Sequence, residues 1–161
     1  MLKIVKLGSK VTDTATGLDG TVTHVYIDVD HRQRYAFQPF GLNPKTLQPL
    51  APIWLASDRF KQKDLKCESV EMPLETLGTT ATDMASGFTG TVVNITMHIS
   101  GCVHLTIQPA GRLPETGNIV DSAEFDIRRL TGPAIPKMNE AERKADQAAR
   151  PSPSFIKRSL R

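Results

Sequence analysis

The chain has 161 residues, of which 23% are charged, and a formal net charge of +3 at pH 7. Its two cysteines, Cys67 and Cys102, are too few for a disulfide framework, so we expect reduced thiols. No apolar run approaches the ~20 residues of a membrane span, and the N-terminal segment lacks the apolar region and cleavage site of a signal peptide. We therefore expect the protein to stay in the cytoplasm in which it is made.

The sequence contains an internal repeat with a constant offset of seventy residues. Residues 7–60 align with residues 77–130 without a gap, and fifteen of the fifty-four pairs are identical. Many identical pairs are turn residues, where backbone geometry restricts the choice of side chain. This pattern indicates a tandem pair of folding units. The pairs include Leu7/Leu77, Gly8/Gly78, Asp13/Asp83, Gly17/Gly87, Gly20/Gly90, Gln38/Gln108, Pro39/Pro109, Gly41/Gly111, Pro44/Pro114 and Arg59/Arg129.

Each repeat has the pattern of four or five short strands joined by turns. The expected elements of the first repeat are a strand at 10–13, a turn at 14–17, a strand at 21–29, a hairpin turn at 30–32, a strand at 34–39 and a closing strand at 53–60. Alternation in the second strand places Val22 and His24 on one face and Val25 and Ile27 on the other. In the second repeat, Val93 and its alternate neighbours Ile95, Met97 and Ile99 are expected to line one side.

The repeated turn is expected to serve folding alone. Its carboxylate can hydrogen-bond the backbone, its first glycine can take a positive φ, and its second marks a bulge or close approach. Neither aspartate has an evident acid or base partner in the repeat. The structural turn residues are predicted to be Asp13, Gly17, Gly20, Asp83, Gly87 and Gly90.

The predicted fold is mostly β, with two tandem SH3-like small β-barrels followed by a C-terminal helical or extended arm. Expected domain boundaries are 1–65 for the first barrel, 66–76 for a linker, 77–131 for the second barrel and 132–161 for the helix and basic arm.

The basic character of the chain belongs to its C-terminal segment. Residues 137–161 hold seven basic and three acidic side chains, which leaves residues 1–136 with a net charge of −1. The segment ends in SFIKRSLR, which carries Phe155, Ile156 and Leu160 among basic side chains. Such an arm could contact nucleic acid through phosphates, but its apolar residues favour a protein partner. The predicted partner-binding residues are Phe155, Ile156, Lys157, Arg158 and Leu160.

The sequence offers no recognisable catalytic set, and we expect no enzyme, no cofactor and no metal. The four histidines form no helical pair, and the glycines do not precede a helix as a phosphate-binding loop requires. His98 and His104 should approach each other across a hairpin, so a metal site with Cys102 is an open alternative. Paired polar side chains on the wet face of a hairpin are the simpler interpretation.

The motif D-x-x-(T/S)-G-(F/L)-x-G-x-V, followed by a Gly-Cys hairpin turn and Gln-Pro, resembles small, mostly uncharacterised β-domains encoded by tailed bacteriophages. The second repeat matches it more fully; in the first, Leu18 replaces the aromatic residue and His31-Arg32 replaces Gly-Cys. The resemblance implies a phage context and a small β-domain. Its residues in the second repeat are Asp83, Ser86, Gly87, Phe88, Gly90, Val92, Gly101, Cys102, Gln108 and Pro109.

Three functions are compatible with these features. The first is a non-enzymatic virion structural protein, such as a capsid decoration or head-tail accessory protein, that assembles in the host cytoplasm and acts through contacts with other virion proteins. The second is a nucleic-acid-binding accessory protein. The third is an intracellular phage factor that binds a host protein or a small ligand, for which a pocket built from both repeats near Tyr35, Phe37 and Trp54 would be evidence.

Overall fold

A computed structural model describes residues 1–137, and the expected C-terminal helix and arm lie outside these residues. The described part is mostly β, and its only helices are three-residue 3-10 turns. Its strands are β1 (Leu2–Val5), β2 (Lys10–Thr12), β3 (Asp19–Asp28), β4 (Gln33–Pro39), β5 (Ile53–Leu55), β6 (Cys67–Val70), β7 (Thr80–Asp83), β8 (Thr89–His98), β9 (Val103–Gln108), β10 (Ala123–Asp126) and β11 (Leu130–Thr131). The 3-10 turns are η1 (Ser57–Arg59), η2 (Gln62–Asp64), η3 (Leu74–Thr76) and η4 (Ile127–Arg129).

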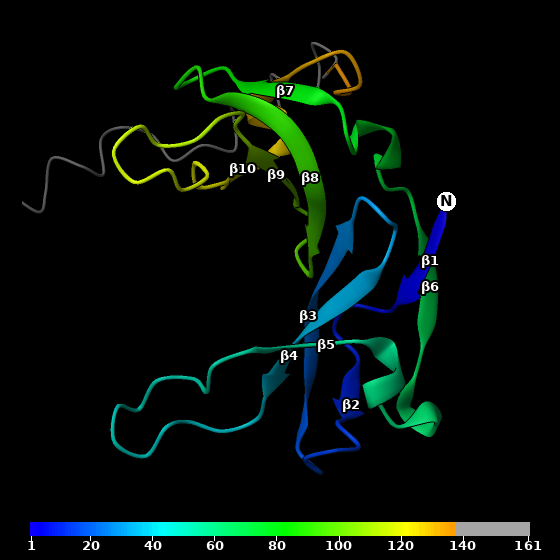
Figure 1. Cartoon of the computed structure of the whole chain (residues 1–161). Helices are drawn as coiled ribbons and strands as arrows, with labels where there is room; N and C mark the ends of the chain where they lie inside the picture. Colours follow the sequence, from blue (N-terminus) through cyan, green and yellow to red (C-terminus); the bar gives the residue numbers. More distant parts are fainter. Residues whose placement is uncertain (138–161) are drawn as a thin grey trace, which may run out of the picture.

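Strands of both repeats join in one nine-stranded sheet. Its main path runs β10-β9-β8-β3-β4-β5, with β2 beside β3, and β7 between β8 and β11. Figure 1 shows β3 and β8 meeting near the middle of the molecule. The expectation of two closed barrels is therefore wrong: the sheets are open, and β5 and β10 lie at opposite ends of the path.

The open form follows from how the long strands use their edges. The first half of β3 pairs with β2 and its second half, from His24 to Asp28, pairs antiparallel with β8. In the same way, the first half of β8 pairs with β7 before its second half meets β3. An unpaired strand edge exposes backbone donors and acceptors. Each repeat satisfies this edge with the equivalent strand of the other repeat, not by closing on itself.

Two hydrophobic clusters lie beneath the sheet, one for each repeat. The first contains ten buried residues, among them Tyr35, Phe37 and Phe60, and the second contains seven, among them Ile95 and Leu105. Partly buried side chains of the segment between the repeats pack against both clusters, namely Met72, Leu74 and Leu77. The two clusters are therefore linked by this shared packing in addition to the β3–β8 ladder.

The segment 66–76, expected to be a linker, forms regular structure. Its strand β6 pairs antiparallel with β1, from Leu2 opposite Val70 to Val5 opposite Cys67. This two-stranded sheet lies on the side of the molecule away from the two long loops (Figure 1). The N-terminal strand is thus paired with residues that follow the first repeat.

The loops 40–52 and 110–122 recur at equivalent positions and project to the same side of the sheet (Figure 1). A glutamine at the end of the preceding strand holds each loop. Gln38 donates from Nε2 to the carbonyl of Leu50 at 2.6 Å, and Gln108 donates to the carbonyl of Val120 at 2.6 Å. The repeated Gln-Pro of the sequence motif therefore has a structural role.

No helix among residues 1–137 has the length and apolar character required to cross a membrane.

Candidate functional site

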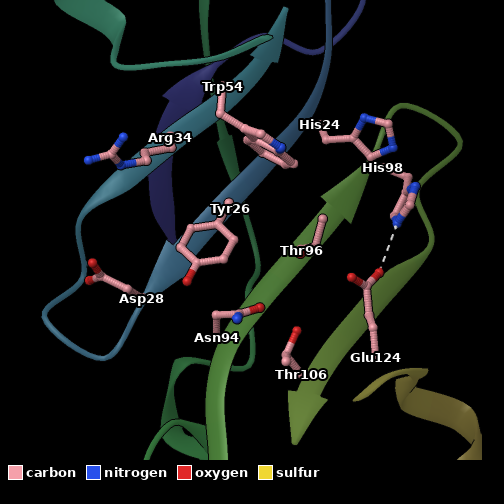
Figure 2. Close-up of a pocket in the computed structure, with 10 residues that line it drawn as sticks. All are labelled: His24, Tyr26, Asp28, Arg34, Trp54, Asn94, Thr96, His98, Thr106 and Glu124. Atoms are coloured by element: carbon pink, nitrogen blue, oxygen red, sulfur yellow. Dashed lines mark ion pairs between the residues drawn. The ribbon is translucent and has the colours of Figure 1, made fainter. Parts of the chain in front are cut away.

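An open groove of about 500 Å³ crosses the junction of the two repeats on the polar face of the large sheet. Each repeat contributes five side chains, so neither repeat forms the groove alone (Figure 2). They are His24, Tyr26, Asp28, Arg34 and Trp54 from the first repeat, and Asn94, Thr96, His98, Thr106 and Glu124 from the second.

A β-bulge in each long strand decides which side chains reach the groove. The register shifts between Val22 and His24 in β3. An extra residue reverses the alternation of faces, so Val22 joins Val25 and Ile27 in the core while His24 and Tyr26 line the groove. The prediction that Val22 shares a face with His24 is wrong for this reason.

The second repeat has the equivalent bulge between Val92 and Asn94. Val92 and Ile95 are fully buried, whereas Val93, predicted to line the same side as Ile95, is only partly buried, and Ile99 is exposed. The pattern of apolar residues alone does not reveal a bulge when valine occupies both adjacent positions.

The groove has an approximate twofold relation between the repeats. Tyr26 and Thr96 are equivalent at the seventy-residue offset and pair with each other across β3 and β8. Equivalent groove positions nevertheless carry different chemistry: Asp28 corresponds to His98, Arg34 to His104, and Trp54 to Glu124. The groove therefore has one aromatic and charged region and one rich in histidine.

The aromatic region is formed by Trp54 and Tyr26, whose ring centroids lie 6.0 Å apart in an edge-on arrangement. Trp54, the only tryptophan of the chain, is 46% exposed. Arg34 is exposed and lies nearby (Figure 2), and none of the ion pairs found among residues 1–137 involves it. A hydrogen bond from the backbone N–H of Arg32 lowers the pKa of Asp28. This region thus offers aromatic surface, a free guanidinium and an ionised carboxylate.

The histidine-rich region contains three imidazole rings in contact. The ring of His98 lies 4.2 Å from that of His24 and 4.5 Å from that of His104, measured between centroids. Burial is the main cause that lowers the pKa of His24 and of His98, and a neighbouring histidine lowers each further. Both rings are therefore neutral at pH 7.

Glu124 of β10 completes this region. Its Oε1 lies 3.7 Å from Nε2 of His98 (Figure 2). The same oxygen lies 2.8 Å from Nδ1 of His104. The predicted approach of His98 and His104 across the hairpin is confirmed. Cys102, the third ligand considered from sequence, is not part of this cluster; its third member is Glu124, from the next strand. Sequence reasoning could not find Glu124, which lies twenty residues away in the chain.

The pocket considered from sequence at Tyr35, Phe37 and Trp54 is only partly correct. Trp54 lines the groove, but Tyr35 and Phe37 are buried in the first hydrophobic cluster. The side chain of Tyr35 does not line the groove. Its hydroxyl accepts a 3.0 Å hydrogen bond from the backbone N–H of Val5.

The predicted turn residues lie away from the groove. Asp13 and Asp83 accept hydrogen bonds from their own turns, at Thr16 and Ser86 respectively. Gly17 and Gly87 have φ values of 71° and 77°. The predicted partner-binding residues Phe155, Ile156, Lys157, Arg158 and Leu160 lie outside the described residues.

The sequence interpretation of these aspartates missed their partners. Arg59 Nε and Nη2 donate to the two carboxylate oxygens of Asp13, both at 2.9 Å. Arg129 makes the same fork with Asp83, at 3.1 and 2.8 Å. The statement that neither aspartate has a repeated partner is therefore wrong. The signal was present, because Arg59 and Arg129 are one of the identical pairs of the repeat.

Comparisons with protein-family models, curated proteins and solved structures found no match to this chain.

Proposed function

We propose that the protein is a non-enzymatic binding protein of a tailed bacteriophage, which acts in the host cytoplasm and holds a small ligand in the groove between its repeats. The observation that carries the proposal is the groove itself, to which the two repeats contribute equally. Its volume of about 500 Å³ lies within the range of small-molecule sites in proteins.

The lining indicates the chemistry of the ligand. Exposed aromatic side chains bind flat rings by stacking, and an unpaired arginine binds an anionic group. Trp54 and Tyr26 provide the aromatic surface, and Arg34 provides the unpaired positive charge (Figure 2). We therefore infer a ligand with a planar ring and a negative charge, of which nucleotides are the simplest example.

Fluorescence of Trp54 gives a direct test, because no other tryptophan contributes to the signal. We expect nucleoside mono- and diphosphates, or a small-molecule extract of infected cells, to change its emission in a saturable manner. An Arg34→Ala variant should bind at least ~10-fold more weakly, since a charged hydrogen bond contributes about 1.5 kcal/mol or more. Arg112→Ala, on the remote loop 110–122, is the matched control and should bind normally.

The proposal fails if neither the nucleotides nor the extract changes the emission. It also fails if binding occurs but is unchanged in Arg34→Ala, because the ligand would then lie elsewhere.

A virion assembly role is the second candidate, favoured by apolar side chains on the two projecting loops. Phe40, Leu42 and Leu47 are 53%, 58% and 71% exposed, and Leu113 and Ile119 of the equivalent loop are also exposed. Exposed apolar groups that cluster on one side of a protein are typical of interaction surfaces.

Mass spectrometry of purified virions tests this candidate. A structural component is expected at a fixed copy number relative to the major capsid protein, and deletion of 151–161 should abolish its incorporation while the β-units stay folded. Absence from the particle would exclude this role and leave the intracellular binding protein.

We also propose that the two units descend from one small SH3-like β-unit by tandem duplication. The support is that β2, β3, β4, β5 and η1 recur as β7, β8, β9, β10 and η4 at the same offset as the sequence repeat.

A further inference from the structure

We propose that His98, His104 and Glu124 bind a zinc ion at the histidine-rich region of the groove. One potential ligand atom of each residue lies within 4.8 Å of those of the other two. The inference does not depend on the nature of any small ligand in the groove.

The distances suit a tetrahedral metal. Zinc bonds of 2.0–2.2 Å to nitrogen and oxygen place neighbouring ligand atoms about 3.4 Å apart. Glu124 Oε1 lies 2.8 Å from His104 Nδ1 and 3.7 Å from His98 Nε2, so the observed separations lie on either side of this value. Small rotations of the side chains would therefore complete the geometry.

The unsatisfied nitrogen of His98 is a second observation that points to a ligand. Its Nε2 is buried and has no hydrogen-bond partner among residues 1–137. Leaving a buried polar atom unpaired is unfavourable, and a metal ion at this point would satisfy it.

The ligands are held by adjacent strands, which gives the site rigidity. His98, His104 and Glu124 come from β8, β9 and β10, successive strands of the sheet. His24 packs against His98, and the Nδ1 atom of His24 lies 2.8 Å from the hydroxyl of Thr23, which fixes its ring. Ligands on such supported elements lose little freedom when the metal binds.

The donor set favours zinc over calcium and magnesium. Two imidazole nitrogens and one carboxylate are typical ligands of zinc, whereas calcium and magnesium prefer oxygen ligands throughout. Three protein ligands leave a fourth position for water or for a donor atom of a molecule in the groove. Metal binding at Nδ1 requires the tautomer of His104 in which Nε2 carries the proton, so that the Nδ1 lone pair, which otherwise faces Glu124, is donated to the metal.

The proposal is tested by treating the full chain with a chelator and then titrating it with Zn²⁺ in a calorimeter. We expect one ion per chain with a dissociation constant in the micromolar range or tighter, and visible d–d bands of tetrahedral Co²⁺ when cobalt replaces zinc. His104→Gln and Glu124→Gln should each weaken binding at least ~10-fold and abolish the cobalt bands. Circular dichroism establishes that these variants are folded. Because Glu124 is exposed, its substitution is expected to disturb the fold little.

Two control variants separate this site from other metal ligands in the chain. Cys102→Ser and His31→Asn should bind zinc as the wild type does, because Cys102 is outside the cluster and His31 lies in the hairpin turn between β3 and β4. Three results would overturn the proposal: no zinc binding by the wild type, unchanged binding in folded His104→Gln and Glu124→Gln, or loss of binding in Cys102→Ser.

Discussion

An Asp13→Ala protein is expected to lose ~3 kcal/mol of its free energy of unfolding. Asp13 is 1% exposed, and its carboxylate accepts the fork of Arg59 together with bonds from the Thr16 hydroxyl and the backbone of Ala15. Removing one partner of a buried ion pair costs several kcal/mol, because the other charge stays behind. Arg59 is partly exposed, so water recovers some of this cost.

Urea unfolding monitored by circular dichroism measures the effect. Asp30→Ala is the matched control, since Asp30 also pairs with an arginine, Arg32, but on the surface. Exposed ion pairs contribute little, so this variant should remain within ~0.5 kcal/mol of the wild type. Equal stability of Asp13→Ala and Asp30→Ala would show that the fork of Arg59 does not stabilise the fold.

Acid unfolding gives an independent measure of the same contacts. The hydrogen bond from Arg59 lowers the pKa of Asp13 from 3.8 to about 2, and bonds from Ser86 and Arg129 lower that of Asp83 to about 2. A lowered pKa means that the folded state favours the ionised form. The stability that these carboxylates contribute is therefore complete above pH 3.8 and is lost as the pH falls towards 2. Asp13→Ala should flatten this part of the stability profile.

These contacts show what a repeat in sequence can and cannot predict. The recurrence of Asp13 and Asp83 correctly indicates a turn, because the bonds within the turn are local. The partners Arg59 and Arg129 lie forty-six residues further along the chain. The recurrence of these arginines was visible in the sequence, but only the folded chain brings η1 and η4 back to the turns. That an aspartate and an arginine both recur in the two repeats therefore does not by itself reveal that they are in contact.

The groove was less predictable than the turns. The strands β3 and β8 were expected from their apolar residues, but a strand pattern does not specify which strand lies beside it. Pairing between equivalent strands arises because each leaves half of an edge free. The bulges then turn His24 and Tyr26 towards the groove. The site thus depends on long-range pairing and on one extra residue in each strand.

A second large effect is expected from Gly20→Ala, which should destabilise the fold by ~3 kcal/mol or more. An added Cβ would lie 2.4 Å from the backbone carbonyl oxygen of Gln38 and 2.7 Å from the ring of Phe37. The carbonyl belongs to the paired strand β4, so it cannot rotate away as a flexible side chain could. The strands β3 and β4 must separate, or the buried ring must move.

Gly90→Ala tests the equivalent position, where the added Cβ would lie 2.3 Å from the carbonyl oxygen of Gln108. The matched control is Gly17→Ala, because Gly17 has nothing within 4 Å of the added atom. Its φ of 71° costs an alanine only about 1–2 kcal/mol. Urea unfolding should therefore rank Gly20→Ala and Gly90→Ala well below Gly17→Ala in stability. The reverse order would mean that positive φ, and not the close approach of neighbouring strands, is the reason for glycine in this motif.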